Sequence, residues 1–107
     1  MDKSKKKEKG TRRNEGKPWI GEISGRFLEG LGQVLTLKKE QIERGIERGN
    51  WKKGFPEEEI IDSLMRHYVE YIKGNKFDDD TGHDHRFHMA VNLMFWIELY
   101  FNNKNWE

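Results

Sequence analysis

The sequence predicts an all-α protein, a small helical bundle of three to four helices preceded by a disordered basic N-terminal tail. Apolar residues recur every three or four positions in several segments, which is the spacing of one helix face. Proline followed by three glutamates at Pro56–Glu59 is typical of a helix start. The alternation of apolar and polar residues that marks β-strands is nowhere convincing. Helices therefore account for the periodic part of the chain.

Charge and apolar content divide the 107 residues into two parts. Residues 1–16 contain almost no large apolar side chain, so we expect a flexible basic tail there and a single all-α domain over residues 17–107. Residues 1–17 carry eight lysines and arginines against three acids, net +5, whereas the remaining 90 residues are net −4. A basic tail occurs in polyanion-binding proteins and as a solubilising end. Because the rest is acidic and has no recognised DNA-binding motif, we expect no nucleic-acid partner.

The composition excludes several classes of protein. There is no cysteine, so disulfides, thiolate metal sites and cysteine nucleophiles are excluded, and any metal must be held by histidine, carboxylate or carbonyl groups. No apolar run approaches a membrane span or a secretory signal. We therefore expect a cytoplasmic protein with no membrane partner. An ordered part of this size often gains stability by association, so we also expect a homo-oligomer.

Two helical segments are expected before residue 50. The first begins near Ser24, and its apolar positions are Phe27, Leu28, Leu31, Val34 and Leu35. Residues 38–48 follow as a second helix or a continuation of the first, with Ile42 and Ile46 one turn apart and Gly49 as the stop.

The second half of the chain predicts two longer helices. After a loop over residues 50–55, a helix should run from Pro56 to Gly74. Residues 75–82 form a polar connection. The last helix should span about residues 83–101, and it is apolar nearly all round from Met89 onward. This pattern implies burial on several sides or an oligomer interface.

Histidines and acids gather around the expected hairpin of these two helices. His85, His88 and Asn92 share one face of the last helix, Asp78–Asp80 precede it, and Arg66–His67 lie on the preceding helix. Imidazoles three residues apart can hold a metal, and Asp78 can add an oxygen ligand. An imidazole can equally bind phosphate or act as a general acid or base. The alternative is a set of interhelical hydrogen bonds at a polar helix end.

Two weaker patterns are further candidate sites. Glu40 with Glu43, and Glu59 with Asp62, are acids at helical spacing that two packed helices could direct at Mg²⁺, although a solvated face explains them as well. Trp51 and Trp19 lie beside Lys53 and Lys17, and such pairs can stack a base and contact a phosphate. Aromatic residues in loops also anchor the loop to a core.

Residues 50–98 resemble the phage-associated dATP/dGTP diphosphohydrolase N-terminal family, whose members are connected by name with the all-α MazG-like nucleotide pyrophosphohydrolases. An upstream segment, residues 14–18, is similar to the motif that opens the family. The matching residues are Asn50-Trp51, Lys53-Gly54, Pro56, Leu64, Arg66-His67, Gly74, Asp78, Thr81-Gly82, His85, His88, Asn92, Phe95 and Glu98.

The resemblance implies a metal-dependent hydrolase that binds a purine nucleoside triphosphate with Mg²⁺ or Mn²⁺ and releases pyrophosphate. Transferred residue by residue, it places Asp78, His85, His88 and Asn92 at the metal or phosphate site, with Arg66, His67 and Lys53 assisting phosphate binding. We accordingly expect Asp78, His85 and His88 to hold the metal and His67, His85 and His88 to act in catalysis. Lys53, Arg66 and Asn92 are the expected phosphate-binding residues, and Trp51, from its pairing with a lysine, is expected to bind the nucleotide. The protein would then be phage-encoded and act in the host cytoplasm.

Two departures from the family pattern favour an alternative. A Gly-Ala-x-Lys-Tyr-Gly stretch of the family is replaced by the longer, more charged residues 37–47, and an acidic pair after Gly74 is replaced by Asn75-Lys76. A pocket altered in this way suits a non-catalytic phage protein that sequesters a nucleotide signalling molecule, in the manner of an anti-defence sponge.

Overall fold

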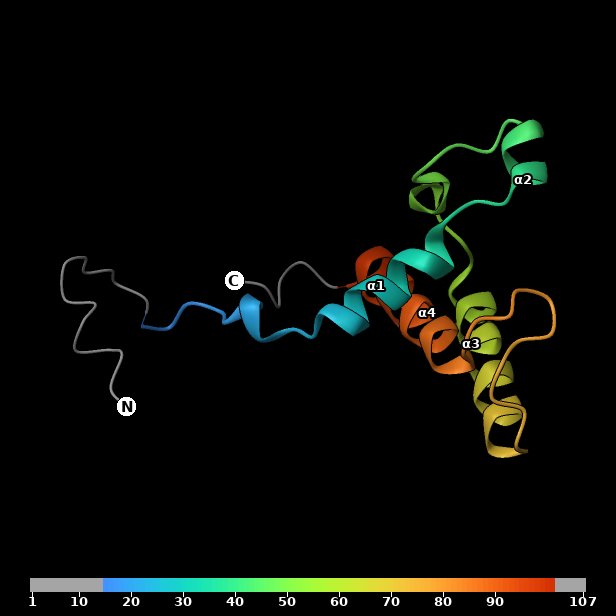
Figure 1. The fold of residues 1–107 in the computed structure, drawn as a ribbon. Coiled ribbons are helices and arrows are strands. Elements are labelled where there is room, and N and C mark those ends of the chain that lie inside the picture. Colours follow the sequence, from blue (N-terminus) through green and yellow to red (C-terminus); the bar gives the residue numbers. More distant parts are fainter. Residues whose placement is uncertain (1–14, 102–107) are drawn as a thin grey trace.

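The computed structural model describes residues 15–101, and the regular elements of this part of the chain are helices (Figure 1). The prediction of a small all-α bundle is confirmed. The α-helices are α1 (Gly25–Leu35), α2 (Lys39–Glu43), α3 (Glu57–Ile72) and α4 (His85–Tyr100), with 3₁₀ turns η2 (Ile20–Glu22) and η3 (Asn50–Lys53). Within residues 15–101, β pairing is confined to one antiparallel bridge between Phe77 and Asp84.

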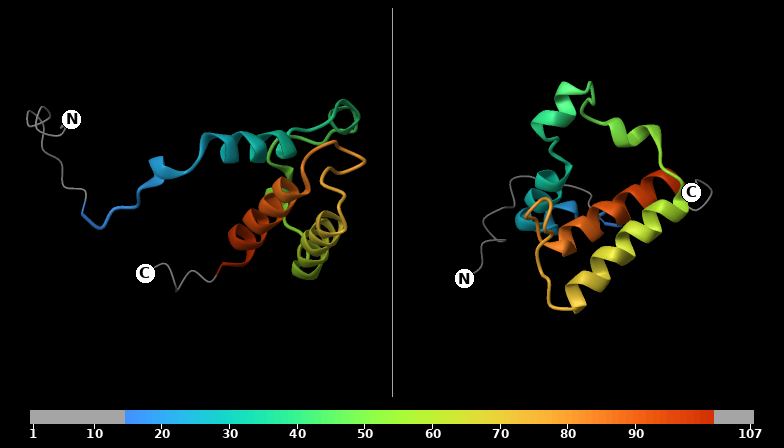
Figure 2. Two further views of the ribbon diagram at one scale, coloured as in Figure 1. Left: turned by 60° about the horizontal axis from the view of Figure 1, so that its bottom comes forward. Right: turned by 90° about the vertical axis from the view of Figure 1, so that its right-hand side faces the viewer.

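The centre of the fold is an antiparallel hairpin of α3 and α4, which lie side by side along their length (Figure 2). Ile60 of α3 and Val91 of α4 are the buried apolar side chains among the described residues. The sequence sets both helix boundaries locally. Gly74, at a φ of 102°, ends the α3 segment, and the Asp84 carboxylate accepts a hydrogen bond from the Arg86 amide to cap α4. The bend between the helices consequently falls on residues 75–84.

Helix α1 packs across α4 and extends away from the hairpin (Figure 1). Ser24 caps it by accepting a hydrogen bond from the Phe27 amide at 3.2 Å. The packing depends on Gly30, which is buried, because a Cβ atom at this position would overlap the ring of Phe87 on α4. The glycine that weakens the helical pattern in the sequence is therefore the point of closest approach between the two helices.

The segment between α1 and α3 differs from its prediction. The helix expected over residues 38–48 is shorter, because α2 ends at Glu43 and Gly45 adopts a left-handed φ of 87°. It does not continue α1 either, since Thr36 is extended. The predicted loop at residues 50–55 contains η3, which ends at Gly54. The last helix begins at His85, two residues later than expected, because Asp84 is its cap.

Among the described residues, no helix is long and apolar enough to cross a membrane. The predicted flexible tail at residues 1–16 lies outside the described residues except for Glu15 and Gly16.

Candidate functional site

Three histidines meet where the α3–α4 hairpin approaches its connecting bend. His67 comes from α3, and His85 and His88 come from α4. The Nδ1 atoms of His67 and His85 are 2.8 Å apart, so one ring donates a hydrogen bond to the other. The rings of His67 and His88 stack with centroids 4.4 Å apart and planes 1° from parallel. The hairpin thus brings together imidazoles that are up to 21 residues apart in sequence.

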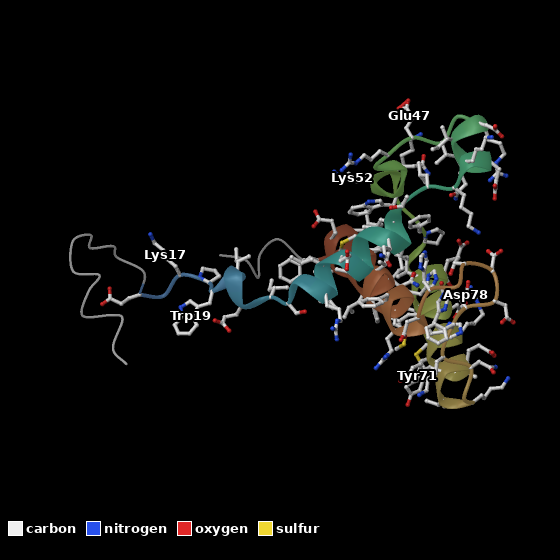
Figure 3. All side chains as sticks on the ribbon, in the orientation of Figure 1. Lys17, Trp19, Glu47, Lys52, Tyr71 and Asp78 are labelled. Carbon is white, nitrogen blue, oxygen red and sulfur yellow. The ribbon has the colours of Figure 1, made fainter. Side chains whose placement is uncertain are left out.

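Asp78 is held beside this cluster by a turn in the connecting segment (Figure 3). Its Oδ2 atom accepts hydrogen bonds from the amide and the hydroxyl of Thr81, both at 3.0 Å. The same Thr81 hydroxyl lies 2.8 Å from Nε2 of His88. Since the hydroxyl has one proton and gives it to the carboxylate, His88 must donate from Nε2 to the Thr81 oxygen. In the neutral ring this leaves Nδ1 of His88 as the unprotonated nitrogen.

The surroundings favour the neutral form of His67 and His88 and the ionised form of Asp78. Burial lowers the pKa of His67, and the neighbouring His88 and His85 lower it further. Burial also lowers the pKa of His88, although the Asp78 charge opposes this. Burial alone would raise the pKa of Asp78, but its hydrogen bonds from Thr81 outweigh burial and lower it. The lowered pKa values therefore favour lone pairs on His67 and His88 beside one negative charge on Asp78.

His67, Asp78 and His85 form a candidate metal site, because they offer ligand atoms that all lie within 4.8 Å of one another. The ligand types are two imidazole nitrogens and a carboxylate oxygen. This combination fits a transition ion such as Mn²⁺ better than Mg²⁺, which prefers oxygen ligands throughout. The set differs from the one predicted, since His67 is the histidine that groups with His85 and Asp78, whereas His88 is hydrogen-bonded to Thr81.

A cavity of about 690 Å³ opens beside the histidines, between the hairpin and the segment that joins α1 to α3. This volume lies within the range of small-molecule sites. One part of its wall is aromatic, because Phe95 packs against Trp51 and Phe55 with ring centroids 5.0 Å and 5.3 Å away. The part of the wall that α3 and α4 form is polar and charged. It contains Arg66, His67, His88, Asn92, Ser63, Glu59 and Asp62.

The predicted nucleotide-binding residues separate into two groups. Trp51, Arg66 and Asn92 line the cavity. Lys53 is exposed, although it shares η3 with Trp51, and it is not part of the cavity wall that the described residues form. Trp19 lies far out on the N-terminal arm (Figure 3). The tryptophan–lysine pairing in the sequence therefore does not identify a phosphate-binding lysine of the cavity, because none of the described lysines lines its wall.

The acid pairs separate in the same way. Glu59 and Asp62 lie one turn apart on α3 and line the cavity. Glu40 and Glu43 lie on α2, which stands apart from the hairpin (Figure 1), and they are not part of this wall. Two acid pairs on packed helices therefore do not form.

Two residues near the site were not singled out from the sequence. Thr81 connects Asp78 to His88, and only its place in the Asp78-to-Gly82 motif pointed to it. Ser63 lies four residues before His67, on the same face of α3, and its Oγ accepts a hydrogen bond from the Asn92 amide at 3.1 Å. Asn92 also donates to the His88 carbonyl at 3.1 Å, so these contacts position the amide beside the cavity.

Comparison with known proteins identifies the family. Residues 7–107 match the family model described as dATP/dGTP diphosphohydrolase, N-terminal. A protein of Salmonella phage PMBT28 named dATP/dGTP diphosphohydrolase is 35% identical over 90 residues, which is 82% of this chain and 29% of the phage protein. The chain thus spans less than a third of the length of that relative. No solved structure matches. The family match covers nearly the whole sequence, and the chain belongs to the dATP/dGTP diphosphohydrolase N-terminal family.

Proposed function

We propose that this chain binds a purine nucleoside triphosphate in the cavity and hydrolyses it, with a divalent metal ion, to the monophosphate and pyrophosphate. Water would attack the α-phosphorus, and the bond to the bridging oxygen of the β-phosphate would break. The proposal rests on one observation above all, which is that a single cavity joins an aromatic wall to imidazole, guanidinium and carboxylate groups. One of these imidazoles, His67, also belongs to the candidate metal site, whereas Asp78 and His85 lie behind the cavity wall. The relative's name, which specifies dATP and dGTP, supports a purine substrate.

The cavity has the two surfaces that a nucleotide requires. Trp51 and Phe95 offer planar apolar rings on which a purine can stack. Arg66 can donate to phosphate oxygens, and its fork-shaped guanidinium suits two of them at once. Glu59 and Asp62 add negative charge to the same wall, so a triphosphate needs accompanying cations to bind there. Metal-bound nucleotide is therefore the species that the wall favours.

His67, Asp78 and His85 are the residues that would hold a metal ion. A divalent ion bound there supplies charge neutralisation for the phosphates and lowers the pKa of a bound water. Nδ1 of His88, left unprotonated by the Thr81 hydrogen bond, can accept a proton from the attacking water. Asn92, fixed by Ser63 and the His88 carbonyl, completes the polar side of the cavity. A relationship to MazG-like enzymes, a phage origin and action in the host cytoplasm stay predictions.

The test is incubation of the purified chain with each ribo- and deoxynucleoside triphosphate in the presence of Mg²⁺ or Mn²⁺. We expect dATP and dGTP to yield monophosphate and pyrophosphate. The double variant His85→Ala, His88→Ala should lose this activity, and circular dichroism should show that it retains its helices. Equal turnover by both proteins would show that the cluster is not the active site.

The same experiment separates hydrolysis from sequestration, the alternative that the altered residues 37–47 suggest. These residues also border the cavity, through Leu37, Gln41, Ile46 and Glu47. If the chain binds nucleotide and releases it intact after heat denaturation, hydrolysis is refuted and a non-catalytic binding protein is supported.

A further inference from the structure

A second pocket, of about 360 Å³, opens between α2 and the bend that joins α3 to α4. We call it the polar pocket, because Val34 is the one apolar side chain among the described residues that line it. Lys38 and Arg44 flank α2, and Thr81 and His83 come from the bend. Neither Lys38 nor Arg44 lines the larger cavity, so the polar pocket has basic groups of its own.

The polar pocket adjoins the cavity. Val34 and Gln41 line both spaces. Opposite them, the hydroxyl of Thr81 in the polar pocket lies 2.8 Å from Nε2 of His88 in the cavity wall. The two spaces therefore meet at these residues, and a ligand longer than the cavity can extend from one into the other.

The order of residues along the hairpin sets the direction of a bound nucleotide. On α4, Phe95 lies seven residues after His88, which is about 10 Å along the helix axis. The aromatic wall is therefore at one end of the cavity, and His88 is at the end that meets the polar pocket. A purine stacked on Trp51 and Phe95 then directs its phosphates towards His88, and the terminal phosphates lie beyond it.

The cavity wall is poorly charged for three phosphates. Among the described residues that form it, Arg66 is the one lysine or arginine. It faces the carboxylates of Glu47, Glu59 and Asp62 in the same wall. Because a triphosphate carries several negative charges, its terminal phosphates are attracted to a neighbouring region that is richer in cations.

The polar pocket has such a balance, with Lys38 and Arg44 against Glu40 and Asp80. The Arg44 side chain is exposed, and its guanidinium has no hydrogen bond or ion pair among the described residues. Nζ of Lys38 lies 3.5 Å from Oδ2 of Asp80, but the Asp80 side chain is 85% exposed, and ion pairs of this kind are weak. A phosphate can therefore replace Asp80 as the partner of Lys38.

Gln41 adds a hydrogen-bond donor of fixed orientation. The backbone amide of Lys38 donates to its side chain at 2.7 Å, so the accepting atom is Oε1 and the other end of the group is Nε2. Nε2 has no partner among the described residues, and none of their buried side-chain nitrogens lacks one, so Nε2 is accessible. Since Gln41 lines both spaces, its amide can donate to a phosphate where they meet.

We propose that the polar pocket binds the β- and γ-phosphates of the nucleoside triphosphate and the pyrophosphate that hydrolysis releases. Lys38 and Arg44 neutralise the phosphates, and Gln41 donates to them from Nε2. All three fall within residues 37–47, the segment in which this chain departs from the family pattern. The inference rests on the proposed function for its nucleotide, but pyrophosphate carries the same chemistry and can be tested alone.

Calorimetric titration in Mg²⁺ with three probes tests the polar pocket. The probes are dGMP, inorganic pyrophosphate and a dGTP analogue whose methylene bridge between the α- and β-phosphorus blocks cleavage. The double variant Lys38→Ala, Arg44→Ala should bind the analogue and pyrophosphate about 10-fold more weakly or worse, because two charged contacts are lost. Its affinity for dGMP should change by less than about twofold, since a monophosphate does not reach the polar pocket.

Matched variants separate the pocket from the general charge of the segment. Lys39→Ala, Arg48→Ala removes the same charge from exposed neighbours that line neither space, and it should bind all three probes like the wild type. Gln41→Glu keeps an acceptor for the Lys38 amide but replaces the donor with a negative oxygen, so it should weaken pyrophosphate binding. Gln33→Glu, at an exposed position of α1 outside both spaces, should not. Circular dichroism should show unchanged helix content throughout.

The outcomes distinguish this inference from the proposed function. Loss of pyrophosphate binding in the Lys38→Ala, Arg44→Ala variant supports the polar pocket whether or not the chain hydrolyses nucleotides. A wild-type chain that binds the analogue no more tightly than dGMP, or a double variant that binds the analogue and pyrophosphate like the wild type, overturns the inference and leaves the proposed function standing. Equal losses for all three probes overturn it as well. A wild-type chain that binds none of the probes overturns both.

Discussion

The imidazole rings of His67 and His88 lie face to face, 4.4 Å apart between centroids and 1° from parallel. Two parallel imidazoles this close repel each other when both are protonated, so the packing favours neutral rings. Burial acts in the same direction, because it is the main cause of the lowered pKa of each ring. The stack therefore keeps two nitrogen bases beside the cavity in the form that can bind a metal or accept a proton.

Substitution of a cluster histidine should weaken metal binding selectively. We expect His85→Ala to lower Mn²⁺ affinity by at least ~10-fold in a calorimetric titration, because one of three grouped ligands is lost. His83→Ala is the control, since His83 lies outside the group of three. Equal losses in the two variants would contradict the assignment of ligands.

Thr81 should act through its hydroxyl rather than through its volume. Thr81→Val removes the hydrogen bond that the hydroxyl donates to Asp78 and the one that it accepts from His88, so it should lower kcat by roughly 10–100-fold, as loss of an outer-shell partner does. Thr81→Ser keeps the hydroxyl and should retain most activity. Steady-state kinetics on dGTP measures both. A valine variant as active as the serine variant would show that the hydroxyl does not position His88.

Arginine and lysine should differ in their effect on substrate binding. Arg66 lines the cavity and Lys53 does not, so Arg66→Ala should raise KM for the triphosphate by about 10-fold or more, the loss of one charge-assisted contact. Lys53→Ala should change KM less than twofold. The reverse order would mean that the phosphates lie outside the cavity, towards η3.

Two glycines of α1 should respond oppositely to alanine. Gly30→Ala forces a methyl group into the ring of Phe87 and should lower the free energy of unfolding by ~1–3 kcal/mol. A methyl group at Gly32 meets open space, and Gly32→Ala should raise that free energy by ~0.5–1 kcal/mol through helix propensity. Thermal or urea unfolding monitored by circular dichroism gives both values. Stabilisation by Gly30→Ala would show that α1 does not pack on α4 in solution.

The sequence by itself determined the helical class, the α3–α4 hairpin and the residues of its bend. These features follow from local rules, since periodic apolar positions, Pro56 with its glutamates and Lys73–Gly74 act within one or two turns. The cap at Asp84, which starts α4 two residues later than expected, became clear only in the structure. Local rules also account for the shared face of His85, His88 and Asn92. They overestimated the length of α2. The helix ends at Glu43 because Gly45 adopts a left-handed turn, and the apolar spacing of the segment does not reveal that turn.

Tertiary structure alone decided which side chains meet. Grouping of His67, rather than His88, with Asp78 and His85 depends on the relative rotation of two packed helices, which residue spacing does not specify. The same rotation places Glu59 and Asp62 on the cavity wall, whereas Lys53 lies outside it. Residues that are distant in sequence come into contact only when the apolar faces of their helices pack together. The cavity forms between such packed elements, so its lining could not be read from residue spacing.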